Sequence, residues 1–100
     1  MYILLPMDSD NQEEASLVKL DDVKIWTQIC VEDGELKEVN HSKDKDGFTN
    51  FSECVVVIND NEYVWPFMEQ SMLVLVAHTQ RSIEDIVEAY LFKELHDLAY

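Results

Sequence analysis

The chain has 100 residues, a length that supports one small domain with a single hydrophobic core. Its 21 acidic and 7 basic residues give a formal net charge of −14, whereas its hydrophobic fraction of 47% is ordinary for a globular protein. A surface this acidic repels phosphate backbones and anionic lipid headgroups, so we expect neither nucleic acid nor a membrane surface as a partner. Composition therefore excludes several classes of function and supplies none.

The N-terminal apolar run is too short for export or for anchoring. Met1–Leu5 has no basic lead and continues into Pro6 and then Asp8. No other window approaches the length of a membrane span. We therefore expect a cytoplasmic protein, in which Cys30 and Cys54 are buried reduced thiols rather than a disulfide.

The first predicted element in chain order is a buried strand. Residues Tyr2–Met7 form a short apolar run that Pro6 and Asp8 close, and the acidic stretch 8–14 is expected to be a solvated loop. From 23 to 32, two sets of residues alternate along the chain. This period of two predicts a second strand with two different faces.

A hairpin turn follows directly. Asp33–Gly34 is a strong signal for a two-residue type I′ turn, which needs a positive φ at both positions. Residues 35–41 then form the return strand. Leu36 and Val39 are three residues apart, so a regular strand would place these two apolar side chains on opposite faces. A β-bulge or an edge position would explain this departure from the alternating pattern.

Two uniformly apolar runs in the second half predict central strands covered on both faces. They are Cys54–Ile58 and Met72–Ala77, and a short helix started by Pro66 separates them. A strand, a helix and a strand in this order form a βαβ unit with a parallel pair of strands. The polar stretch 42–53 before this unit is expected to be an irregular connection with at most one helical turn.

The last element has the clearest helical pattern. Ser82 and Asp85 resemble a capping arrangement. Apolar residues then recur at the spacing of one helix face, and Leu95 and Leu98 continue the pattern beyond a break near Lys93. The face consists of Ile83, Ile86, Val87, Tyr90 and Leu91. Together, the elements predict an α/β domain with a mixed sheet and flanking helices.

In this order the elements resemble the dinitrogenase iron–molybdenum cofactor biosynthesis family, the NifX-like domains. The resemblance rests on the opening YILLPMD, the hairpin VEDGELKEV, the Pro-started helix, and a C-terminal helix with the sequence AYLFKELHDL. Because it spans nearly the whole chain, it implies a single NifX-like domain over residues 1–100. The fold that it implies is RNase-H-like and three-layered. Its mixed five-stranded sheet comprises an N-terminal strand, an antiparallel hairpin and a parallel βαβ unit.

The resemblance also implies a function, because family members are small non-catalytic proteins that bind, carry or hand over metal clusters. This chain departs from the family in its ligand loops. Residues 15–20 lack the family's His-Phe-Gly-like stretch, and the loop 59–65 is bulky and acidic where the family is glycine-rich. Glycine-lined loops let a ligand approach the backbone closely, so no family ligand residue carries over to this sequence.

We therefore expect a non-enzymatic binding or interaction domain without a cofactor. Its partner would be another protein, or a second copy of the chain in a homodimer. The alternative is a carrier of an iron–sulfur or iron–molybdenum cluster, with donors such as Cys30, Cys54 or His41. The candidate interaction loop consists of Asn59, Asp60, Asn61 and Trp65.

The aromatic residues divide between core and surface. Trp26 suits cross-strand packing under a helix, and Phe67 suits the core between helix and sheet. Trp65, at the junction of loop and helix, is compatible with either the core or an exposed interface anchor.

Metal-binding and catalytic patterns are weak. The histidines His41, His78 and His96 lie on separate predicted elements without metal-ligand spacing, and each is expected to be a surface or hydrogen-bonded residue. Asp8 and Asp60 both follow apolar strands, but a two-metal nuclease needs further carboxylates and a basic track for its substrate.

The stretch 42–53 partly matches a calcium-binding loop. Asp44, Asp46, Gly47 and Glu53 fall at suitable positions of that motif. Ser42, however, stands where the first carboxylate belongs, and strands rather than helices flank the stretch. A solvated acidic connection is therefore the favoured interpretation.

Overall fold

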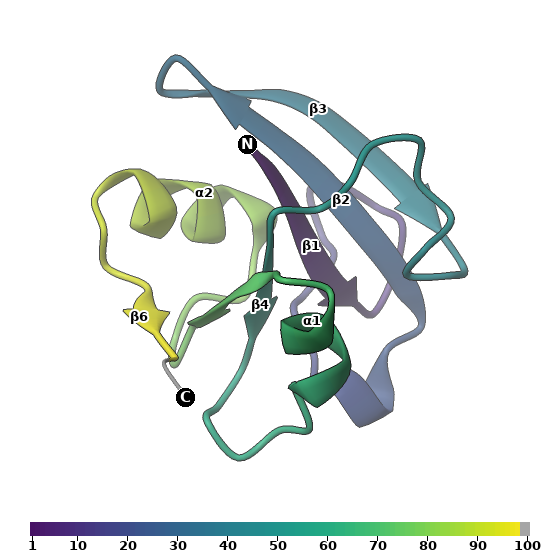
Figure 1. The fold of residues 1–100 in the computed structure, drawn as a ribbon. Coiled ribbons are helices and arrows are strands. Elements are labelled where there is room, and N and C mark those ends of the chain that lie inside the picture. Colours follow the sequence, from purple (N-terminus) through teal and green to yellow (C-terminus); the bar gives the residue numbers. More distant parts are fainter. Residues whose placement is uncertain (99–100) are drawn as a thin grey trace.

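A mixed sheet with one helix on each face forms the protein, as the computed structural model of residues 1–98 shows (Figure 1). The helices are α1 (Trp65–Glu69) and α2 (Ile83–Leu91), and a single 3-10 turn, η1, covers Leu20–Asp22. The six strands lie in the order β3-β2-β1-β4-β5-β6. They are β1 (Tyr2–Met7), β2 (Ile25–Glu32), β3 (Glu35–Ser42), β4 (Cys54–Val57), β5 (Leu73–Val76) and β6 (His96–Asp97).

The predicted parallel pair is confirmed. β4 and β5 pair in parallel from Cys54↔Leu73 to Val57↔Val76, and β1 joins them in parallel through Ile3↔Cys54. Apart from Tyr2 and Leu73 at their first positions, these β-branched and leucine-rich segments are buried on both faces, as is typical of parallel strands. On the other side of β1, β2 and β3 add as an antiparallel hairpin.

The sheet has six strands rather than the five expected. Lys93 adopts a φ of 58°, which ends the helical path after α2 and turns the chain back toward the sheet. His96–Asp97 then pair antiparallel with Leu75–Val76. A strand of two residues shows no period-2 pattern, so the apolar spacing of Leu95 and Leu98 suggests a continuing helix instead.

The hairpin has the predicted turn and the predicted bulge. Asp33 and Gly34 adopt φ values of 54° and 77°, as a type I′ turn needs. Val31 pairs with Leu36, whereas its neighbour Cys30 pairs with Glu38, so one residue of β3 is left over. This bulge moves Leu36 and Val39 to the same face, where both pack against the core.

Strand alternation creates two hydrophobic cores, one on each face of the sheet. Ile83 and Ile86 of α2 complete the first core, and Phe67 of α1 completes the second. Full burial of such a side chain stabilises the fold by about 1.5–3 kcal/mol. Ser82 caps α2 as predicted, because its Oγ accepts the backbone NH of Asp85 at 3.1 Å.

The linker 43–53 contains no helix and covers part of the α1 face. Gln28, a β2 residue that is 1% exposed, points toward this linker. Its Nε2 donates hydrogen bonds to the Asn50 carbonyl and to Ser52 Oγ, both at 2.9 Å. One buried amide thus fixes the irregular connection that the sequence predicts here. Within residues 1–98, no helix is long and apolar enough to cross a membrane.

Candidate functional site

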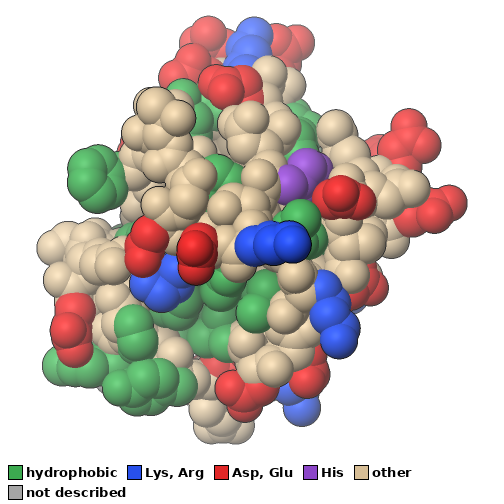
Figure 2. Space-filling view, turned by 90° about the vertical axis from the view of Figure 1, so that its right-hand side faces the viewer, with side chains coloured by type: hydrophobic (Ala, Val, Ile, Leu, Met, Phe, Trp, Pro, Cys, Tyr) green, Lys and Arg blue, Asp and Glu red, His purple; other side chains and the backbone are tan. Residues whose placement is uncertain are grey.

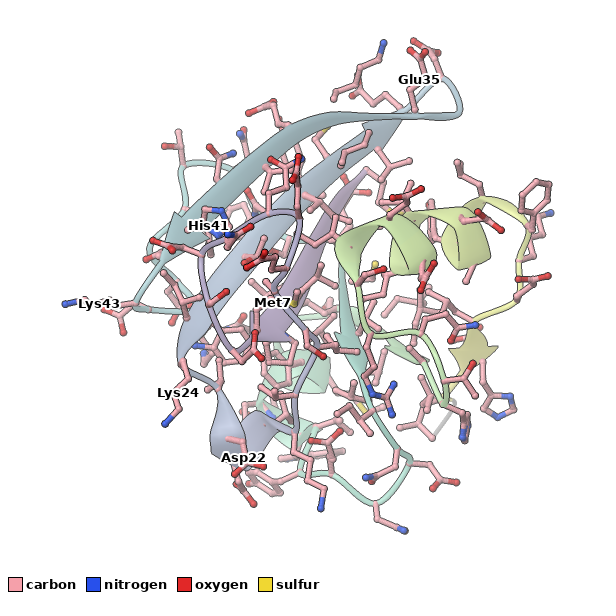
Figure 3. The ribbon with its side chains drawn as sticks, turned by 180° about the vertical axis from the view of Figure 1, so that it is seen from behind. Met7, Asp22, Lys24, Glu35, His41 and Lys43 are labelled. Atoms are coloured by element: carbon pink, nitrogen blue, oxygen red, sulfur yellow. The ribbon has the colours of Figure 1, made fainter. Side chains whose placement is uncertain are left out.

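The carboxyl ends of the parallel strands β1, β4 and β5 meet at one edge of the sheet. Three connections leave this edge: 8–24, 58–64 and 77–82. Figure 3 shows Asp22 and Lys24 beyond the end of β1 that carries Met7, and Glu35 at the far end of the hairpin. Open α/β sheets bind ligands at this edge, so its side chains are the candidates for a site.

The predicted interaction loop lies at this edge, immediately after β4. Asn59 Oδ1 accepts the backbone NH of Asn61 at 3.0 Å, which tightens the loop into an Asx turn. Asp60 and Asn61 are exposed at its tip. Trp65, the first residue of α1, is 54% exposed, which decides the question of core or surface in favour of the surface.

Tyr63, which the sequence interpretation overlooked, is 73% exposed on the same loop. It lines a shallow hollow between the loop and η1, together with Lys19 and Asp21. The sequence did carry a signal for this exposed residue, because Tyr63 stands two positions before Trp65 in a segment between a strand and a helix. The loop therefore presents two large aromatic side chains to solvent.

Glu62 closes the base of the same loop. Its Oε2 accepts the backbone NH groups of Ile58 at 2.8 Å and Asn59 at 3.3 Å, and its Oε1 accepts that of Leu20 in η1 at 2.6 Å. A carboxylate bound by several backbone amides is an arrangement that also holds free anions. Here the chain's own side chain occupies that position and joins two of the three connections at this edge.

Residues 15–17 are also used internally. Ala15 and Leu17 are buried in the core beneath α2. Leu17 forms a β-bridge with Met7 and donates its backbone NH to the Arg81 carbonyl at 2.7 Å. This packing uses Ala15 and Leu17 to support the core rather than to line the edge of the sheet.

Trp26 and Phe67 lie in the core as expected. Trp26 is 9% exposed, and its ring centroid is 6.1 Å from that of Phe67, with the rings tilted by 56°. Lys45 of the linker places its ammonium group 5.8 Å from the Phe67 centroid, in cation–π range. These residues support the fold and line no part of the candidate loop.

The two cysteines are buried and free, but they lie on opposite faces of the sheet. Cys30 pairs with Tyr2, and Cys54 pairs with Ile3, so the alternation of β1 separates them. Burial, followed by the nearby negative charge of Glu53, raises the pKa of the Cys54 thiol to about 12. Metals bind thiolates, so the raised pKa of Cys54 disfavours metal binding by this thiol. The separation of the two cysteines on opposite faces also opposes a cluster shared between them.

His41 contacts Thr27 on the neighbouring strand. It lies on β3, the edge strand opposite β6 (Figure 3), and its Nδ1 contacts Thr27 Oγ1 at 2.9 Å. Within residues 1–98, no three metal-ligating side chains of the His, Cys, Asp or Glu type converge. The structure does, however, bring His78 and His96 together, with ring centroids 6.0 Å apart.

The remaining acidic candidates are dispersed. Asp8 Oδ1 accepts the Ser16 backbone NH at 2.8 Å, which fixes the start of its own connection. In the stretch resembling a calcium loop, Ser42 Oγ accepts the Asp44 NH at 3.1 Å, and Asp46 is exposed. Glu53 instead joins the sheet, because its NH donates to the Tyr2 carbonyl at 2.8 Å. These contacts favour a structural connection.

Comparison with known proteins bears on the fold alone. Neither a family model nor a curated protein matches the sequence. Among solved structures, the crystal structure of PH0822 is similar to this chain, with a TM-score of 0.72 and 17% sequence identity. The similarity covers 100% of this chain and 97% of that chain. The two proteins therefore share an architecture over nearly the whole of both chains.

Proposed function

We propose that this chain is a non-enzymatic, NifX-like interaction domain with an RNase-H-like fold. A central parallel pair with an antiparallel hairpin on one side supports this assignment, since the family resemblance implies the same arrangement. In the proposed function, the loop 58–65 binds a basic protein partner instead of a metal cluster.

The observation that carries the proposal is the Glu62 contact. Backbone NH groups of Ile58, Asn59 and Leu20 would face an anionic ligand at this edge, but the Glu62 carboxylate already binds all three. The same contact gives the loop a fixed shape. A fixed loop can present side chains at its surface without a large entropic cost on binding.

Two aromatic residues are the proposed contact points. Tyr63 and Trp65 are both exposed, and tyrosine and tryptophan are enriched among the residues that contribute most to protein interfaces. Hydrophobic side chains gather at the lower left of Figure 2, on the side of the molecule that carries α1. The loop therefore combines large apolar contact area with a defined backbone.

The charge of the chain indicates a basic partner. Asp60 lies within the loop, Asp21 and Asp22 lie in the adjacent η1, and the chain as a whole carries −14. Complementary charge speeds association and suppresses binding of like-charged proteins. A second copy of the chain would bring an equal negative charge to the interface, so self-association is the less favoured occupant.

The proposal is tested with a lysine-rich amphipathic peptide and isothermal calorimetry. Trp65→Ser and Tyr63→Ser should each weaken binding at least tenfold. Phe51→Ser is the matched control, because Phe51 is 94% exposed but lies on the linker 43–53, and it should leave affinity within twofold. Equal affinities for all variants would show that only the net charge binds the peptide, and would refute the aromatic site.

A second experiment addresses the cluster-carrier alternative. Anaerobic incubation with iron and sulfide should leave the protein colourless. A stoichiometric chromophore that survives gel filtration would overturn the interaction-domain proposal. Alanine substitutions at Cys30, Cys54 and His41 would then show which donors hold the cluster.

A further inference from the structure

We propose that His78 and His96 form a two-histidine site for a divalent transition-metal ion such as Zn²⁺, Ni²⁺ or Cu²⁺. The observation behind this proposal is that the two rings lie side by side, with centroids 6.0 Å apart and planes at 73°. The proposal does not depend on the function proposed above, because the loop 58–65 takes no part in it.

The register of the sheet places the two histidines together. His96 pairs with Val76 in the antiparallel β5–β6 ladder. His78 follows Val76 by two residues, just beyond the end of β5, and its ring lies beside that of His96. Sequence spacing alone could not reveal this pair, because β6 contains only two residues and His78 lies in the connection beyond β5.

Both backbones are held in place before any metal binds. Pairing with β5 fixes His96. The Arg81 guanidinium fixes the connection that carries His78, since its Nη2 donates to the His78 carbonyl at 3.1 Å. Its Nη1 also donates to the carbonyls of Ala77 and Gln80, both at 2.8 Å. Both histidines are exposed to solvent.

The spacing of the rings suits shared coordination. A metal–nitrogen bond of about 2.0–2.1 Å places each ring centroid about 3.2 Å from the metal, so two ligating rings have centroids about 5–6 Å apart. The observed separation lies at the upper end of this range, and small rotations of the exposed side chains would close it. Water molecules would complete the coordination, as they do at sites with open positions.

Charge and ligand type define which ions fit. Imidazole suits zinc, copper and nickel, whereas magnesium and calcium prefer oxygen ligands. Asp97 follows His96, and the acidic chain attracts cations of every kind. The positive charge of Arg81, the basic residue on the same connection as His78, is hydrogen-bonded to three carbonyl oxygens. The histidine pair should therefore select transition metals from the cations that the surface attracts.

The test is calorimetric titration of the full chain with ZnCl₂, NiCl₂ and CuCl₂ at physiological ionic strength, with MgCl₂ in excess to occupy exposed carboxylates. We expect one metal per chain and the tightest binding for Cu²⁺. His78→Ala and His96→Ala should each weaken Zn²⁺ binding at least tenfold. His41→Ala is the matched control and should stay within twofold, because His41 lies at the opposite edge of the sheet.

His96→Gln is a control for misfolding, since it keeps a polar side chain of similar size in β6. Its circular dichroism spectrum should match that of the wild type. Zn²⁺ should also raise the melting temperature of the wild type but not of His78→Ala, because the unfolded chain separates the two ligands. Unchanged affinity in both histidine variants would refute the site. A complex of one metal with two chains would equally refute the intramolecular pair.

Discussion

The linker 43–53 and the loop 58–65 both lie outside the sheet, yet they are stabilised in opposite ways. A buried amide, that of Gln28, donates to the linker from the sheet beneath it. A carboxylate within the loop, that of Glu62, accepts from the loop's own backbone and from η1. A side chain of the sheet therefore fixes the linker, whereas one of the loop's own side chains fixes the loop. The loop can keep its shape while its outer surface stays available, whereas the linker depends on the sheet.

The largest effect is expected at the linker. Gln28→Ala removes a buried side chain and both hydrogen bonds, so it should lower the free energy of unfolding by about 3 kcal/mol. Gln28→Leu retains most of the volume and should cost less. Chemical denaturation measures both values. If the two variants were equally destabilised, the hydrogen bonds rather than the packing would account for the whole contribution of Gln28.

The loop should respond more weakly, because water can reach its backbone amides once the carboxylate is gone. Glu62→Ala should cost about 2 kcal/mol of unfolding free energy, and Glu62→Gln about half of that, since one side-chain oxygen remains. Glu69→Ala, an exposed acidic position in α1, is the control and should change stability by less than about 0.5 kcal/mol.

The Glu62 variants also test the idea of an anion position. Acetate at high concentration should restore part of the lost stability of Glu62→Ala, but it should have no effect on the wild type, where the carboxylate already fills the position. Equal responses of the two proteins to acetate would contradict the internal-ligand interpretation of this loop.

Cys54 lies where the linker ends and β4 begins, and it adds a pH dependence. Its thiol has a pKa of about 12 in the folded state, against a reference value of 9.0. Because the folded pKa is raised, the unfolded chain ionises first, and stability falls as the pH rises above the reference value. Between pH 8 and pH 10 the loss due to this thiol should be about 1.4 kcal/mol.

The measurement compares urea denaturation of the wild type and Cys54→Ala across that pH range. The variant loses packing at every pH, but the difference between the two proteins should shrink toward pH 10. A constant difference would show that the thiol ionises equally in both states, and so that its burial does not persist in solution.

Local patterns in the sequence predicted most of the fold, because they report which residues face a core. The alternation of 23–32, the Asp33–Gly34 turn and the Ser82 cap each depend on residues within a few positions of one another. The boundaries of the two central strands differ from the predicted ones by a single residue at each end or less.

The site was less predictable, because its contacts join distant segments. Nothing near Glu62 in the sequence indicates that its carboxylate reaches the Leu20 amide, 42 positions away. The same holds for Gln28 and the linker, at separations of 22 and 24 residues. The His78–His96 pair depends on the register of a two-residue strand, for which no periodic signal exists.

The smallest expected effects distinguish an almost fully exposed aromatic residue from one that is partly covered. Phe51→Ser should change the free energy of unfolding by less than about 0.5 kcal/mol, because the ring is almost fully in solvent and Gln28 holds the linker on either side of it. Trp65→Ser should cost more, since about half of its side chain is covered at the start of α1. Thermal and urea denaturation of both variants would measure this contrast. If Phe51→Ser were as destabilised as Trp65→Ser, the linker would pack more closely than its exposure indicates, and Phe51 would no longer be a neutral control for binding at the loop.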